Sequence, residues 1–221
     1  GFRYWTDGAY VEPGFMVDNI QIGMGPVFGA ETDEGWTLEG FRTSTGTESG
    51  AYFNAYLAEN RIYRGFDANL ELGPYNFGFQ DQLGDWVERF PYQDGLLVSY
   101  WDTSYTDNNV SAHPGGGLIL PVDAPPPPMY RADGGLWRPR IQSYDSTFSI
   151  DDTDALTLHW NSEASNHPSL QGARAFNDLY DYWTAANPYA SVMVPKAGTE
   201  IYIHNTSAQG NFMKIKVSPV Q

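Results

Sequence analysis

The sequence contains no cysteine among its 221 residues. Disulfides, thiolate metal sites and a cysteine nucleophile are therefore excluded. No apolar run approaches the roughly 18 residues that a membrane-spanning helix needs. Basic side chains are also scarce, because 12 Lys and Arg face 27 Asp and Glu, which gives a net charge of -15. Such a surface repels phosphates, so we expect no nucleic-acid partner. The lack of a long apolar run predicts that the chain has no membrane span.

The sequence also lacks the short motifs of common hydrolases. Its four histidines are His113, His159, His167 and His204, and none belongs to a His-Glu-x-x-His zinc pair. There is no Gly-x-Ser-x-Gly elbow of a serine hydrolase. The triple glycine at 115–117 lacks the Lys and Ser/Thr of a phosphate loop. We therefore expect no catalytic residue in this chain.

What the sequence has in abundance is strand signals, and aromatic residues make up 15% of it. Apolar and polar side chains alternate over residues 200–204 and again over 211–217, with a polar segment between them. A period of two predicts strands with one buried face, and here it predicts a hairpin. Further strands are expected at 2–6, 16–22, 36–41, 96–101, 118–120, 155–160 and 191–194.

One segment has helical spacing. Phe176, Leu179, Tyr180 and Trp183 follow the pattern i, i+3, i+4, i+7, which predicts a short packing helix near residues 174–184. The expected fold is all-β, an antiparallel β-sandwich of jelly-roll-like form with this single helix. Four prolines at 125–128 favour a stiff extended rod, and we place a soft domain boundary there.

Three acidic clusters offer oxygen ligands for Ca²⁺. The first follows the strand at 96–101, and the second packs three carboxylates into residues 151–154. The third consists of Asp7, Glu12 and Asp18 around a Pro-Gly turn. Asp18 lies inside an otherwise apolar strand segment, where a buried acid needs a partner, so this cluster is the preferred calcium site. The alternatives are turns capped by Asp and Asn, or a solvated exterior. The candidate ligands are Asp7, Glu12, Asp18, Asp102, Asp107, Asp151, Asp152 and Asp154.

Two arginines flank Pro139 in an extended segment. Arg forks bind carboxylates well, so Arg138 and Arg140 are expected to form ion pairs with Asp123 and Asp145. The alternative is that they clamp a substrate.

Four longer strings carry a family resemblance: FPYQDGLLVSYWDT at 90–103, TDNN at 106–109, HPG with GLILPVDA over 113–124, and WRPRIQSYDSTF at 137–148. Together they resemble the C-terminal region of the immune inhibitor A metallopeptidases, which are secreted bacterial zinc proteases. The similarity runs from about residue 36 to the C-terminus. Residues 14–20 look like the last strand of the jelly-roll domain that precedes this region in such proteases.

The resemblance implies a parent protein with its zinc site in an upstream catalytic domain, so zinc is expected only there. It implies that 1–23 are the last strands of a preceding jelly-roll-like domain, with a β-rich region at 24–124 and a C-terminal sandwich portion at 125–221. The first residues already have the composition of a β-strand and show no signal-peptide pattern, so we expect a mature or clipped product. The implied role is an ancillary, non-catalytic region, located outside the cell, that supports stability, docking or substrate binding.

Two other functions stay open. One is an independent Ca²⁺-dependent module that binds carbohydrates or cell surfaces through exposed rings, with Trp5, Trp36, Tyr105 and Trp160 as candidates. The other is a carboxylate-based enzyme such as a glycoside hydrolase, which would need a cleft with one carboxyl group of raised pKa.

Overall fold

The structure, a computed structural model, describes residues 19–29, 35, 37, 52–72, 90–161 and 163–220. The chain divides into two compact units, residues 1–51 and 52–221. In the first unit, β1 (Ile20–Gln21) pairs antiparallel with β2 (Val27–Phe28). The second unit, called the C-terminal unit below, contains every other element and both sides of the proline run. The boundary expected at that run stays a prediction.

The first sheet of the C-terminal unit has the order β3-β4-β5 and is antiparallel. Its strands are β3 (Asn54–Arg61), β4 (Gly95–Asp102) and β5 (Ile119–Pro121). Leu96, Val98 and Tyr100 of β4 point into the core because a strand turns alternate side chains to one face. The strands predicted at 96–101 and 118–120 are confirmed within about a residue.

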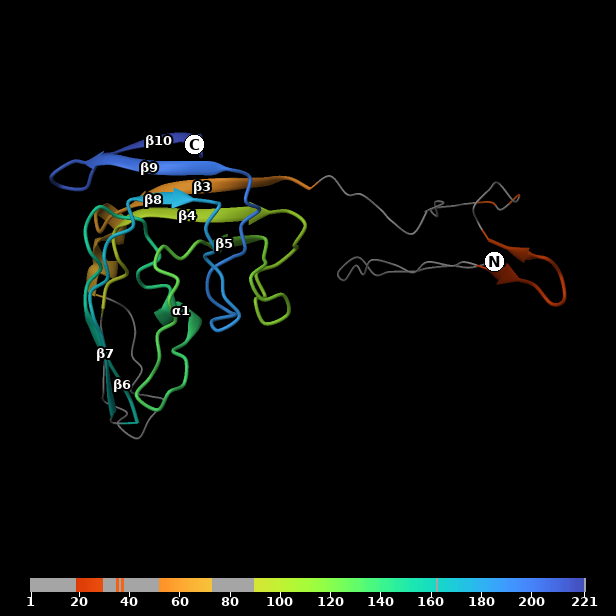
Figure 1. Cartoon of the computed structure of the whole chain (residues 1–221), viewed down its shortest axis with the longest axis horizontal. Coiled ribbons are helices and arrows are strands. Elements are labelled where there is room, and N and C mark those ends of the chain that lie inside the picture. Colours follow the sequence, from red (N-terminus) through yellow and green to blue (C-terminus); the bar gives the residue numbers. More distant parts are fainter. Residues whose placement is uncertain are drawn as a thin grey trace. The chain divides into compact units, whose positions relative to one another are not determined.

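The second sheet has the order β10-β9-β8. Its strands are β8 (Ala175–Asn177), β9 (Thr199–Thr206) and β10 (Met213–Pro219). The predicted hairpin is confirmed by antiparallel β9–β10 pairing, with an irregularity between Lys214 and Ile215. Figure 1 shows this sheet lying across the first one.

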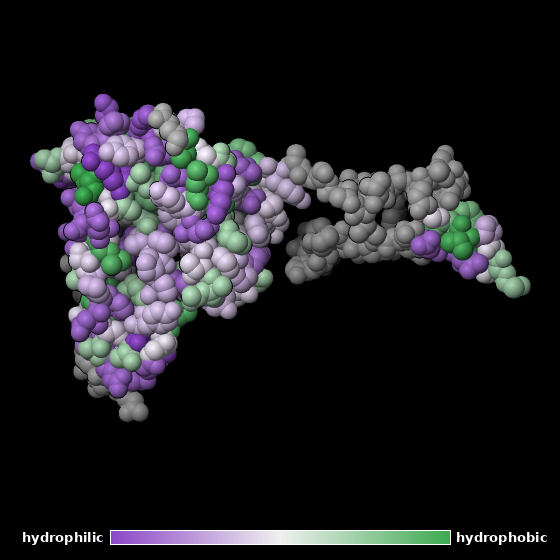
Figure 2. Space-filling view, viewed as in Figure 1, coloured by the Kyte–Doolittle hydropathy of each residue, from purple (hydrophilic) through white to green (hydrophobic). Residues whose placement is uncertain are grey.

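The main core lies between these two sheets. It joins inward residues of the first sheet, such as Val98, to Phe176 of β8 and Ile203 of β9. The remaining buried members are Leu96, Tyr100, Leu120, Val122, Ala124, Phe148, Tyr182, Val192 and Ile201. The all-β, antiparallel expectation is thus confirmed, whereas jelly-roll connectivity stays a prediction. Figure 2 shows a largely hydrophilic face of this unit with small, separate hydrophobic patches.

A second core lies beside the hairpin of β6 (Leu156–Trp160) and β7 (Glu163–His167). Trp137, Tyr144 and Leu158 are buried there, next to the four-residue helix α1 (Pro139–Gln142). A 3₁₀ segment at Gly65–Leu72 lies between β3 and β4 in the sequence.

The helix expected near 174–184 is wrong. Residues 175–177 form β8, and turns and loop follow. The Tyr182 hydroxyl donates to the carbonyl of Asn177 (3.2 Å) and accepts from its N–H (3.1 Å), which closes a tight turn. Phe176 and Tyr182 face the core from this strand and turn, whereas Leu179 and Tyr180, which the helical spacing placed on one face with Phe176, are exposed. Residues 191–194 are likewise a loop instead of the predicted strand.

Candidate functional site

Asp102 at the end of β4 and Asp107 in the loop after it are two of the predicted Ca²⁺ ligands. In each of them, one side-chain oxygen accepts a hydrogen bond from the backbone of the same segment. Asp102 Oδ1 accepts the Ser104 N–H (2.9 Å). Asp107 Oδ1 accepts the Asn109 N–H (2.7 Å), and Asn108 Oδ1 accepts the Ile119 N–H (2.8 Å). These are the side-chain-to-backbone bonds by which Asp and Asn stabilise turns. The capped-turn alternative therefore describes the geometry of this loop.

His113 closes the same loop. Its Nε2 lies 2.8 Å from Asp107 Oδ1, and its Nδ1 lies 2.6 Å from the Gly116 carbonyl oxygen. Since both ring nitrogens meet acceptors, the doubly protonated imidazolium fits best. The Gly116 carbonyl, followed by Asp107, raises the pKa of His113. The N–H of Asn109, followed by His113, lowers the pKa of Asp107.

We expect Asp107→Asn to lower the pKa of the His113 imidazole towards its ordinary value, because the variant removes one of the two acceptors that favour the charged ring. NMR titration of the ring protons measures this directly. His167 is the internal control: burial lowers its pKa, and its titration should not move. An unchanged His113 pKa in the variant would contradict the pairing.

The second acidic cluster is also a turn. Asp152 Oδ1 accepts the Gly172 N–H (3.1 Å), and Asp151 donates its own N–H to Ser149 Oγ (3.1 Å). All three carboxylates of residues 151–154 are exposed. Across the described part of the chain, no group of three or more His, Asp or Glu could hold a metal ion. Asp7, Glu12 and Asp18 lie outside the described residues, so the calcium hypothesis stays a prediction.

The histidines do not fit a zinc site either. His167 Nε2 accepts the Trp137 Nε1–H (3.1 Å), so its lone pair is used inside the unit. His159 lies on β6, His204 lies on β9, and His113 is tied to its loop. None of them joins a metal-binding group among the described residues.

Two of the aromatic candidates for sugar binding, Trp160 and Tyr105, pack against other side chains. The Arg131 guanidinium lies 4.6 Å from the Trp160 ring centre, and Trp137 meets the same ring at 6.4 Å edge-on. Tyr105 packs against His113 (4.8 Å between ring centres). Trp5 and Trp36 lie outside the described residues.

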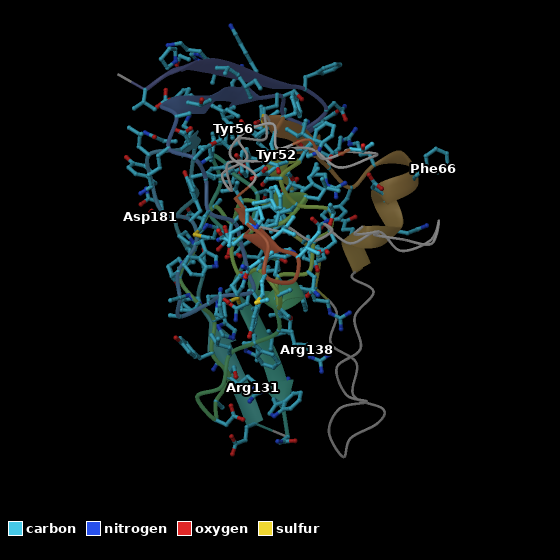
Figure 3. All side chains as sticks on the ribbon, turned by 90° about the vertical axis from the view of Figure 1, so that its right-hand side faces the viewer. Tyr52, Tyr56, Phe66, Arg131, Arg138 and Asp181 are labelled. Carbon is cyan, nitrogen blue, oxygen red and sulfur yellow. The ribbon has the colours of Figure 1, made fainter. Side chains whose placement is uncertain are left out.

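The expected ion pairs of Arg138 and Arg140 with Asp123 and Asp145 are wrong: none joins these side chains in the ranges 90–161 and 163–220. Figure 3 shows Arg138 and Arg131 at the end of the unit that carries β6 and β7. Burial, followed by the charges of Arg140 and Arg131, lowers the pKa of Arg138. The two aspartates are instead buried, with 2% and 4% of their surface exposed.

A third buried acid, Asp178, was missed by the sequence analysis. Its Oδ1 accepts the N–H groups of Gly198 and Thr199 (both 2.8 Å). Its Oδ2 accepts the Ala197 N–H (3.0 Å) and the Tyr56 hydroxyl (3.1 Å). Tyr56 belongs to β3 and Asp178 follows β8, so this carboxylate links the two sheets. The signal available in the sequence was an acid two residues after the apolar Phe176.

Comparison with known proteins shows the family of this chain. The family model described as the VEG domain of immune inhibitor A-like metallopeptidases matches residues 50–215. Immune inhibitor A from Bacillus thuringiensis subsp. alesti is 29% identical over 215 residues, covering 91% of this chain and 28% of the relative. The pre-pro-metalloprotease PrtV from Vibrio cholerae serotype O1 (strain M66-2) is 26% identical over 225 residues, covering 99% and 23%. The chain thus spans about a quarter of these relatives. It belongs to the immune inhibitor A-like metallopeptidase family, of which residues 50–215 are the VEG domain.

Proposed function

We propose that this chain is an ancillary, non-catalytic β-domain of a secreted bacterial zinc metallopeptidase, docked on the rest of the parent polypeptide. One observation carries the proposal. Several of the described groups that could act as acids, bases or metal ligands form hydrogen bonds within the unit: Asp178 with backbone donors, His167 with Trp137, and Asp107 with its own loop. Catalysis needs such groups beside an open position for substrate or metal.

The docking surface in this proposal is the outer strand β10. It is an edge strand in the order β10-β9-β8, so one side of its backbone has no strand partner in this sheet. Ile215 is 37% exposed and Val217 63% exposed, and Phe212 just before the strand is 78% exposed. An edge strand with exposed apolar side chains is a template for contact with another segment. The small scattered patches of Figure 2 suit an interface between domains, since such interfaces are more polar than a core.

The occupant in this proposal is the remaining part of the parent peptidase. The relatives are roughly four times as long as the matched region, which leaves ample chain for a catalytic domain. Lys214 and Lys216 alternate with the apolar side chains of β10 and so point to the opposite face of the strand. A segment that pairs with this edge should therefore carry apolar side chains on one face and acidic ones on the other.

The test uses the parent polypeptide and the isolated chain side by side. Val217→Asp should change the melting temperature of the isolated chain by less than about 2 °C, because the side chain is largely exposed. In the parent it should expose the domain to limited proteolysis and lower the stability of the whole peptidase. The isolated chain should show no zinc-dependent cleavage of casein.

The matched control is Tyr130→Asp, which places the same charge at a side chain that is 46% exposed in the loop before α1. It should behave like the wild type in the parent. Zinc-dependent cleavage by the isolated chain would overturn the non-catalytic role. Identical proteolysis of the Val217→Asp and Tyr130→Asp parents would remove β10 as the docking surface.

A further inference from the structure

Three aspartates are buried among the described residues of the C-terminal unit, and their surroundings are very different. Asp178 is fully buried and receives four hydrogen bonds, three of them from backbone N–H groups. That cage compensates a negative charge well. Asp123 receives one hydroxyl hydrogen bond, from Ser146 Oγ at 3.2 Å. No lysine, arginine or histidine forms an ion pair with Asp123 or Asp145 within the described ranges.

Asp123 and Asp145 come together from two segments that lie side by side. Asp123 follows β5, and Asp145 follows α1. The Ala124 N–H donates to the Ser146 carbonyl (3.3 Å), and the Asp123 N–H donates to Ser191 Oγ (3.0 Å). The pair is therefore enclosed by chain from three places in the sequence.

The groups that act on this pair are few. The titratable ones are the two carboxyls and the Tyr144 phenol, and the uncharged hydroxyls are those of Ser146 and Ser191. Burial, followed by the charge of Asp145, raises the pKa of Tyr144 to about 12, so the phenol stays protonated and neutral. Nothing cationic among the described residues offsets two negative charges here.

A buried carboxylate without a compensating partner is unfavourable, and two neighbouring ones repel each other as well. We propose that Asp123 and Asp145 form a buried carboxyl pair that holds protons in the folded state, so that the C-terminal unit is more stable in mild acid than above neutral pH. This device is independent of the proposed docking role.

The direction of the pKa shifts agrees. Burial raises the pKa of Asp145 to about 7. Burial, followed by the charge of Asp145, raises the pKa of Asp123 well above its ordinary range. Because the folded state holds these protons more tightly than the unfolded state, their stabilising effect is complete below about pH 4, the unfolded pKa. It is lost as the pH rises through the folded values.

The test compares thermal unfolding of the full chain at pH 5 and pH 8 for the wild type, Asp123→Asn and Asp145→Asn. Asparagine has the shape of a protonated carboxyl group but cannot ionise. We expect the wild type to melt several degrees lower at pH 8 than at pH 5. Each variant should melt at least roughly 3 °C above the wild type at pH 8 and show a smaller pH difference. A variant with the wild-type pH difference, or with lower melting at both pH values, would overturn the proposal.

Asp178→Asn is the matched control, because it removes an equally buried but fully compensated charge; it should melt lower at both pH values. If either variant fails to fold, the ¹³C carboxyl titration of the wild type decides: the proposal requires Asp145 to titrate near pH 7, and a midpoint near 4 refutes it. Calcium chloride and EDTA at pH 8 form the last arm. A calcium-dependent rise in melting temperature that Asp145→Asn abolishes would show a cation site in place of a proton site.

Discussion

Replacing Asp178 by alanine is expected to lower the free energy of unfolding of the C-terminal unit by about 3–5 kcal/mol. The variant leaves the N–H groups of Ala197, Gly198 and Thr199 and the hydroxyl of Tyr56 without their acceptor. These donors lie in a part-buried region where water replaces the lost bonds poorly. Urea unfolding of the full chain, followed by tryptophan fluorescence, measures the loss.

Tyr56→Phe is the graded companion to this variant. It removes only the bond between the hydroxyl and Asp178 Oδ2, and it keeps the ring packed 4.7 Å from Phe176. Burial, followed by the charge of Asp178, raises the pKa of Tyr56, so the phenol remains a donor at all ordinary pH values. The expected loss is about 1–2 kcal/mol. Equal losses for the two variants would mean that the three backbone bonds to Asp178 add no stability.

The second large effect is expected from Phe176→Ala, which should lower the free energy of unfolding by about 3–5 kcal/mol. Phe176 is completely buried between the sheets, where its ring meets Tyr56, Phe148 and Tyr182 at 4.7, 5.7 and 5.5 Å between centres. Truncation removes the buried apolar area and opens a cavity that the surrounding rings cannot fully close.

Phe66→Ala is the control for this variant. It deletes the same type of side chain from the 3₁₀ segment, where Phe66 is fully exposed. Figure 3 shows the side chain of Phe66 pointing away from the unit. The expected change is within about 0.5 kcal/mol. If the two variants lost similar stability, Phe176 could not be part of the main core.

The sequence predicted the best strands because their pattern is local. The alternation over 200–204 and 211–217 reflects burial on one face, and the structure has β9 and β10 there. It did not predict β3, whose residues Asn54–Arg61 mix polar and apolar side chains without regular alternation and are mostly exposed. That strand exists through its backbone pairing with β4, and pairing with a distant partner leaves no periodic signal.

The error at 174–184 has the same origin. The spacing i, i+3, i+4, i+7 fits a helix, but Phe176 is buried from β8, while Leu179 and Tyr180 in the turn after it are exposed. The preference of each residue is weak compared with the hydrogen bonds of Asn177 to the Tyr182 hydroxyl, which no periodicity reveals.

Composition and local pattern thus established an acidic, cysteine-free, all-β chain, and the strings at 90–148 established its likeness to the immune inhibitor A peptidases. The burial and the hydrogen-bond partners of the acids depended on the tertiary structure. Asp178, Asp145 and Asp107 are the same residue type, yet one is held by backbone donors, one lies in the core with little compensation, and one caps a surface turn. The reason is physical: a carboxylate's charge state and partners depend on donors and burial contributed by residues far away in sequence, and those come together only when the sheets pack.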